Sequence, residues 1–328
     1  MRRREFLIGT GLSAAALPVS PRTRAADAMK RVAILMGVVD DKVGQNRVAA
    51  FQFGLREFGW EEGRNVHYEV RWGAGDAART RDYAQELVAL NPDLILATNT
   101  PTARALKQAT GTAPIIFTGL ADPVADGIVA SHANPSGNFT GFVSFSAAIA
   151  GKWLQLLKEA APSSTRVVVL YNPDTAPYAI FYPVMEAIAP GLGMTLVRSP
   201  VRDKEAIESV IGGLSAETGG ALAIMPDVFM LLHGKTIFDL AVNRRLPSVS
   251  PLRQFVVAGS LISYGSNFDK LFRQAASYAD RILRGEKPNK LPVQEPTEYE
   301  LIVNLKTAKA IGLTMPETLL GRADEVIE

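Results

Sequence analysis

Residues able to bind a small charged ligand follow the apolar segments of this sequence at regular intervals. Asn99 and Thr100 follow a run that ends at Ala97, and Asp227 follows the run 220–225. Their side chains donate and accept hydrogen bonds, and a carboxylate can pair with an ammonium group. Because the carboxyl ends of parallel strands open onto one crevice, we expect such residues to share a binding site. The candidates at strand ends and crossovers are Val39, Asp40, Asn99, Thr100, Thr118, Gly119, Asp122, Tyr171, Asn172, Asp227 and Tyr264.

Some of these candidates are suited to the charged groups of an amino acid. A helix that begins at Asn99-Thr100-Pro101 would direct its first backbone N–H groups towards a carboxylate. The alternative is that Asn99 or Thr100 only caps this helix. Asp122 or Asp227 could accept hydrogen bonds from an ammonium group, although Asp122 precedes Pro123 and could instead be a turn residue.

The remaining side chains of the proposed cleft bear on the ligand class. Tyr171, Phe229 and Tyr264 could stack on an aromatic ring, although single aromatic residues near strand ends more often belong to the core. No candidate is Arg or Lys, which argues against a phosphate or a dicarboxylate as the ligand.

The sequence lacks the common catalytic and cofactor motifs. It has no G-x-G-x-x-G after the first strand, no G-x-x-x-x-G-K-[ST] and no G-x-S-x-G. His67, His132 and His233 occur singly, outside the spacings of metal ligands. The absence of cysteine excludes disulfides and thiolate chemistry. We therefore expect a protein that is not an enzyme and needs no cofactor or metal.

The N-terminal residues predict export. Arg3-Arg4-Glu5-Phe6-Leu7 has the form of a twin-arginine signal, an apolar stretch follows over 8–19, and a cleavage site is expected at about 25–28. Residues 1–28 contain five Arg against two acidic residues, so their removal changes the formal net charge from +2 to −1. Nucleic acid is therefore a poor candidate partner. No later segment approaches the ~20 apolar residues of a spanning helix, which predicts a soluble periplasmic protein.

Strands and helices alternate along the chain in two series. This alternation predicts two doubly wound α/β lobes with parallel sheets, each of ordinary domain size. The first series has expected strands at 31–36, 65–72, 93–97, 114–117 and 139–143, and helices at 44–58, 77–90 and from 100. The second has expected strands at 166–170, 194–198, 220–225, 247–250 and 298–304, and helices at 146–160, 176–189, 203–214, 229–244 and 267–285.

An ordered set of motifs resembles the ABC-transporter substrate-binding proteins of the hinged periplasmic type, in the branch with tryptophan- and phenylalanine-binding members. The motifs are 53–60, 62–66, 121–124, 127–129, 134–141, 263–265, 283–288, 291–293 and 304–328. The resemblance implies a periplasmic binding protein-like fold of type I, with two lobes joined by three strands. We expect one lobe to hold 29–142 with about 265–292, and the other 143–264 with about 293–328.

The resemblance also implies a function. A monomer would capture a small molecule, either an amino acid or another small carboxylate, between its lobes and deliver it to an ABC permease in the inner membrane. The alternative is a soluble sensor that docks on a membrane receptor. The sequence does not distinguish transport from sensing.

Overall fold

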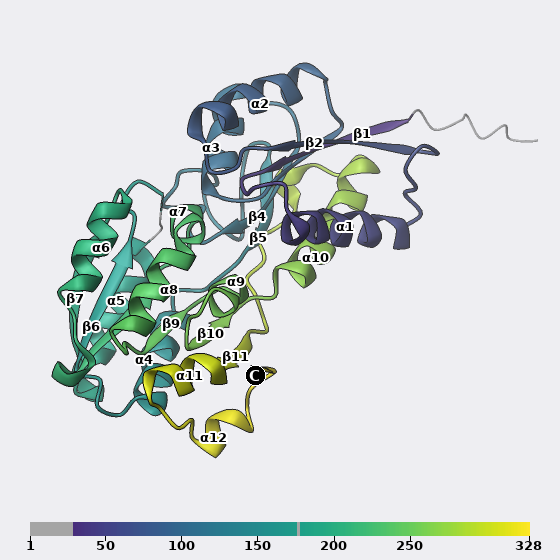
Figure 1. Ribbon diagram of the computed structural model, residues 1–328. Coiled ribbons are helices and arrows are strands. Elements are labelled where there is room, and N and C mark those ends of the chain that lie inside the picture. Colours follow the sequence, from purple (N-terminus) through teal and green to yellow (C-terminus); the bar gives the residue numbers. More distant parts are fainter. Residues whose placement is uncertain (1–28, 176–177) are drawn as a thin grey trace, which may run out of the picture.

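The computed structural model describes residues 29–175 and 178–328 (Figure 1). The expected export signal, residues 1–28, lies outside the described residues. In the described part of the chain, no helix is long and apolar enough to cross a membrane.

Five parallel strands form the first sheet, in the order β2-β1-β3-β4-β5. Their residues alternate between two helical layers: Ile34 of β1 packs with Phe51 of α1 and Phe272 of α10, whereas Leu35 packs in the cluster that contains Leu87 and Leu106. Burial on both faces explains why these strands are continuous apolar runs. The strands are β1 (Lys30–Met36), β2 (Val66–Trp72), β3 (Leu94–Ala97), β4 (Ile115–Leu120) and β5 (Phe139–Val143), and the helices are α1 (Lys42–Glu57), α2 (Ala77–Ala89), α3 (Thr100–Ala109) and α10 (Phe268–Leu283).

Seven strands form the second sheet, in the order β12-β11-β10-β9-β8-β6-β7. They are parallel except at the β10–β11 pair, where Ile262 lies opposite Val303 in an antiparallel register. The strands are β6 (Arg166–Tyr171), β7 (Thr195–Pro200), β8 (Gly220–Ile224), β9 (Ser248–Ser250), β10 (Ile262–Gly265), β11 (Glu300–Asn304) and β12 (Glu325–Ile327). The helices are α4 (Ile149–Ala160), α5 (Tyr178–Ile188), α6 (Lys204–Gly212), α7 (Val228–Leu232), α8 (Gly234–Asn243), α9 (Arg253–Val257), α11 (Leu305–Ile311) and α12 (Glu317–Leu320). The predicted fold class, two doubly wound α/β units with mostly parallel sheets, is confirmed.

Four features of the second unit differ from the expectation. The expected helix 229–244 is two helices, α7 and α8, separated at His233. Helix α9 and strand β10 were not predicted as regular elements, because both are short. The C-terminal residues pair as β12 with β11, and Arg322 forms an ion pair of 2.6 Å with Glu159.

The chain passes between the two sheets three times: after β5, after β10 and before β11 (Figure 1). Hydrogen bonds join the three crossings to one another. The Val143 N–H donates to the Gln294 carbonyl at 2.9 Å, and the Ser146 N–H donates to the Tyr299 hydroxyl at 2.9 Å. The Ser266 hydroxyl donates to the Ser144 carbonyl. These links place the crossings side by side, on one edge of the space between the sheets.

Candidate ligand-binding site

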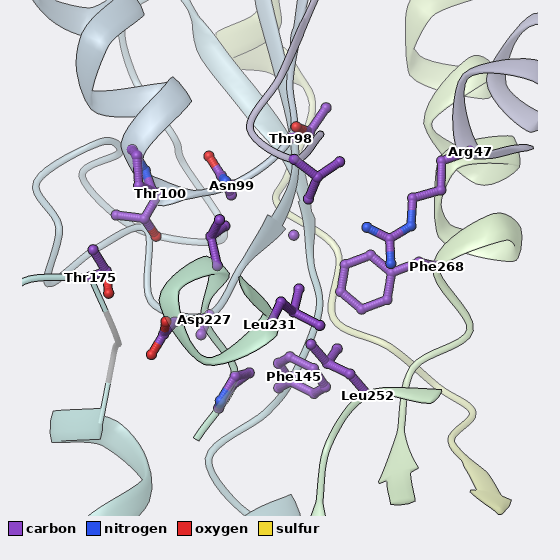
Figure 2. Close-up of a pocket in the computed structure, with 16 residues that line it drawn as sticks. Arg47, Thr98, Asn99, Thr100, Phe145, Thr175, Asp227, Leu231, Leu252 and Phe268 are labelled. Carbon is purple, nitrogen blue, oxygen red and sulfur yellow. The ribbon is translucent and has the colours of Figure 1, made fainter. Parts of the chain in front are cut away.

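A cavity lies between the two sheets, at the ends of the strands of both units (Figure 2). Its volume is about 60 Å³, which is less than half the ~150 Å³ of an engineered cavity that binds benzene. The cavity in this structure is therefore too small to enclose a ligand the size of benzene. The cavity is lined by Val38, Arg47, Thr98, Asn99, Thr100, Pro101, Gly119, Ala121, Phe145, Thr175, Pro226, Asp227, Val228, Leu231, Leu252 and Phe268.

Asp227 contributes a buried carboxyl group from the second unit. It is the N-cap of α7, and its Oδ1 accepts a hydrogen bond from the Met230 N–H at 2.8 Å. Its Oδ2 is buried and has no hydrogen-bond partner among the described residues. Burial raises the pKa of Asp227 to about 6, although nearby backbone N–H groups oppose this shift. The carboxylate is therefore mostly ionised at neutral pH and has an acceptor atom free for a ligand.

Thr175 lies beside Asp227 in the cavity wall (Figure 2). The Thr175 hydroxyl lowers the pKa of Asp227 slightly. The two side chains are not joined by a full hydrogen bond, because Thr175 Oγ1 is itself buried without a partner in the described part of the chain. Two unpaired oxygen atoms thus lie on the same side of the cavity.

Arg47 contributes a buried guanidinium from α1 in the first unit. Only 6% of the residue is exposed, and its Nε has no hydrogen-bond partner among the residues the structure describes. The guanidinium carbon lies 4.5 Å from the centre of the Phe268 ring, a cation–π geometry. Burial lowers the pKa of Arg47 to about 10, while the charges of Asp269 and Asp41 counteract the shift. The group remains charged at neutral pH without an ion pair to any described residue.

The start of α3 is capped by its own side chains. Asn99 Oδ1 accepts from the Thr102 N–H at 3.0 Å, and Thr102 Oγ1 accepts from the Asn99 N–H at 3.1 Å. Pro101 has no N–H to offer. The Asn99 amide lies so close to Gly37 that a Cβ there would be 1.9 Å from Nδ2, so the amide position depends on that glycine. In the first turn of α3, only the Thr100 N–H is left for a ligand carboxylate.

The rest of the wall is mainly apolar and aromatic. Phe145 and Phe268 have ring centroids 6.3 Å apart, and Leu231 and Leu252 complete the wall. Apolar area of this kind would bury the hydrocarbon part of a ligand, while the few polar groups fix its orientation.

The structure brings four of the eleven predicted residues to this cavity: Asn99, Thr100, Gly119 and Asp227. The other seven lie elsewhere. Asp122 Oδ1 accepts from the Ala125 N–H at 2.9 Å, so this carboxylate caps a turn as the alternative interpretation proposed. Val39 is exposed, and Asp40 accepts from Gln45 Nε2. Thr118, Tyr171 and Asn172 are buried outside the cavity wall, and Tyr264 stacks on Tyr299.

Sequence reasoning missed Arg47, Phe145 and Phe268. None of the sequence candidates was basic, whereas Arg47 lines the cavity, so the argument against a phosphate or a dicarboxylate loses its premise. A signal was available: Arg47 occupies the stripe of α1 that also carries Gly44, Val48 and Phe51, all buried. A charged residue on an otherwise buried stripe is uncommon unless it has a partner.

Comparisons with known proteins identify the family of this chain. Residues 31–327 match the family described as ABC transporter substrate binding protein. A tyrosine-binding protein from Clostridioides difficile (strain R20291) is 26% identical over 259 residues, covering 79% of this chain and 74% of that protein. The structure of an ABC domain in complex with L-Trp from Streptococcus pneumonia has a TM-score of 0.84 at 22% identity, covering 92% of this chain and 100% of the other. The ligand-free, open structure of a substrate-binding protein with adhesive properties from Clostridium difficile has a TM-score of 0.71 at 25% identity, covering 91% and 99%. The chain belongs to the ABC transporter substrate-binding protein family.

Proposed function

We propose that this protein captures an amino acid between its two lobes and delivers it to an ABC permease. The observation that carries the proposal is the clustering of unpaired polar atoms. Of the five buried side-chain atoms without a partner in the described residues, three line this one cavity: Arg47 Nε, Thr175 Oγ1 and Asp227 Oδ2. Buried polar groups in native proteins are normally paired, so a ligand is the expected partner.

The charges of the cavity support an amino acid. Asp227 would accept hydrogen bonds from the ammonium group, and the Thr100 N–H and the Thr175 hydroxyl, on the same side of the cavity, would donate to the carboxylate (Figure 2). The Thr100 hydroxyl itself donates to Asp126 Oδ2 at 3.1 Å. Phe145 and Phe268 suit an aromatic side chain. The names of the tyrosine-binding relative and of the L-Trp complex support the same ligand class.

The proposed lobes are 29–142 with about 265–292, and 143–264 with about 293–328. The packing of α10 on α1 supports the first assignment, and the pairing of β11 and β12 with the second sheet supports the other. Rotation about the three crossings would open the cavity and close it over the ligand. Binding without catalysis is consistent with a family of substrate-binding proteins.

The proposal places the protein outside the cytoplasm, where such a protein meets its ligand. The paired arginines of residues 1–7 motivate a twin-arginine export route. Replacing Arg3 and Arg4 by Lys should leave the precursor in the cytoplasm. An unchanged periplasmic yield, measured by cell fractionation and immunoblotting, would contradict this route.

Titration calorimetry with the aromatic amino acids tests the proposed ligand class. Removing one partner of a buried ion pair typically costs about 3–5 kcal/mol, so Asp227→Asn should weaken binding at least about a hundredfold. Asp203→Asn is the matched control, because Asp203 caps α6 in the same way but is exposed and distant from the cavity wall. Native affinity in Asp227→Asn, or a loss in Asp122→Asn instead, would overturn the assignment of the ammonium site.

A further inference from the structure

Arg47 and Asp227, which form no ion pair with any described residue, lie on opposite sides of the cavity. Figure 2 shows Arg47 and Phe268 on one side, Asp227, Thr100 and Thr175 on the other, and Leu231 between the two groups. The Asp227 side holds the hydroxyl and carboxylate groups that suit the head group of an amino acid. The Arg47 side holds a cation and an aromatic ring.

An amino acid held at Asp227 would therefore extend its side chain past Leu231 towards Arg47. The apolar residues Phe145 and Leu252 border this path and suit the hydrocarbon part of the side chain. The end of the side chain would meet the guanidinium, whose Nε is unpaired and whose position is set by stacking on Phe268.

We propose that Arg47 determines the specificity of the site by hydrogen bonding to an oxygen acceptor at the far end of the ligand's side chain. Among the aromatic amino acids, this selects the phenol of tyrosine over the bare ring of phenylalanine. The inference rests on the proposed amino-acid function and adds which side chain the site prefers.

The physical reason is the cost of leaving the guanidinium without a partner. In the unliganded protein Arg47 is 6% exposed and forms no ion pair with any described residue. A ligand that fills the cavity excludes the remaining water, and one without an acceptor leaves the buried Arg47 Nε without a hydrogen-bond partner. Sites that hydrogen-bond a substrate hydroxyl reject the analogue lacking it far more strongly than apolar pockets reject a missing methylene.

Calorimetric titrations of four probes into four proteins test the inference. The probes are L-tyrosine, L-phenylalanine, 4-carboxy-L-phenylalanine and 3-(4-hydroxyphenyl)propionate, which keeps the phenol but lacks the ammonium group. The proteins are the wild type, Arg47→Met, Arg47→Lys and Asp227→Asn, each checked for folding by thermal denaturation. Met is unbranched and packs well on aromatic rings, so Arg47→Met should fold. Arg47→Lys keeps the charge but loses the planar fork of donors. It replaces Arg47→Met as the test variant if the Met variant does not fold.

The wild type should bind tyrosine at least about tenfold more tightly than phenylalanine, and 4-carboxy-L-phenylalanine should also be favoured over phenylalanine. Arg47→Met should lose that preference by weakening the probes that carry a phenol or a carboxylate on the ring while leaving phenylalanine unchanged, and Arg47→Lys should retain part of the preference. Asp227→Asn should weaken tyrosine and phenylalanine by the same factor and leave the probe without an ammonium group nearly unaffected.

The results that differ from these expectations would contradict the role of Arg47, the amino-acid function, or both. Equal losses for tyrosine and phenylalanine in Arg47→Met would overturn the inference, because Arg47 would then bind the shared head group. A wild type that binds phenylalanine as tightly as tyrosine would also overturn it. If only the hydroxyphenylpropionate binds, and binds through Arg47, the inference stands and the amino-acid function fails. If no probe binds the wild type, both fail.

Discussion

Asp227 and Arg47 are single residues with buried charges, and neither forms an ion pair with a residue that the structure describes. Water solvates such groups much better than a protein interior does, so each costs free energy in the unliganded state. Neither charge neutralises the other, since no ion pair joins them in the described chain. A ligand that supplies the missing partners therefore gains from both, and this makes the two residues the first targets for measurement.

Ligand affinity should decrease as the pH falls below about 6. Burial raises the pKa of Asp227 to about 6, so the unliganded protein carries a protonated carboxyl group below that pH. Only the ionised form pairs with an ammonium group, so binding must displace a proton, and affinity should fall about tenfold per pH unit below the pKa.

Calorimetry in buffers of different ionisation enthalpy measures the released proton directly. Between about pH 5 and pH 7, binding should release protons, and Asp227→Asn should bind with no release. A dissociation constant that stays the same across this range would contradict the role given to Asp227.

At the scale of elements, the site is built from the first turns of short helices. Helix α7 has five residues and begins at the Asp227 cap, and α3 begins at the Asn99 cap. Each cap orients a polar side chain at the end of a strand while it stabilises the helix. The same residue thus has a structural role and a position in the cavity wall.

Asn99→Ala should lower the free energy of unfolding by about 1 kcal/mol, the usual cost of losing an N-cap. Asn99→Ser should keep most of that stability, because serine caps helices about as well as asparagine. Chemical denaturation of both variants measures the difference. Equal destabilisation by the two substitutions would show that the Asn99 amide matters for its packing on Gly37 rather than for the cap.

At the scale of the whole molecule, the two units touch at the rim of the cavity. A Cβ on Gly75, in the loop between β2 and α2, would lie 2.8 Å from Leu232 Cδ1 and 3.1 Å from Val228 Cγ1 of α7. The absence of a side chain at this position lets the loop of the first unit approach the helix that carries Asp227.

Gly75→Asn should therefore oppose closure and weaken binding. Asparagine tolerates the positive φ of +75° at this position, so the main effect is steric. Overpacking of this kind typically costs about 1–3 kcal/mol, which is about fivefold to 150-fold in affinity.

Gly59→Asn is the matched control, because Gly59 also has a positive φ, +89°, but a Cβ at that position would have nothing within 4 Å of it. Small-angle scattering with saturating ligand should show a larger radius of gyration for Gly75→Asn than for the control. Equal affinity and equal radius in the two variants would show that this contact does not limit closure.

The fold class and two residues of the cavity wall, Asn99 and Asp227, were predictable from the amino-acid sequence. Parallel strands that are buried on both faces appear as continuous apolar runs, as in residues 31–36. Such a run can be recognised in the sequence without the structure. Asn99 and Asp227 were predictable because each follows its strand directly, and the end of a strand has a known place in an open sheet.

Which of the candidate residues reach the cavity depends on how the elements pack in three dimensions. Thr118 precedes Gly119 in the same strand, yet it is fully buried outside the cavity wall. Arg47 lies within a helix, and its environment depends on Phe268, which the chain brings to it more than two hundred residues later. Contacts between residues so far apart in sequence leave no local pattern, because they arise from how the two units and their helices pack together.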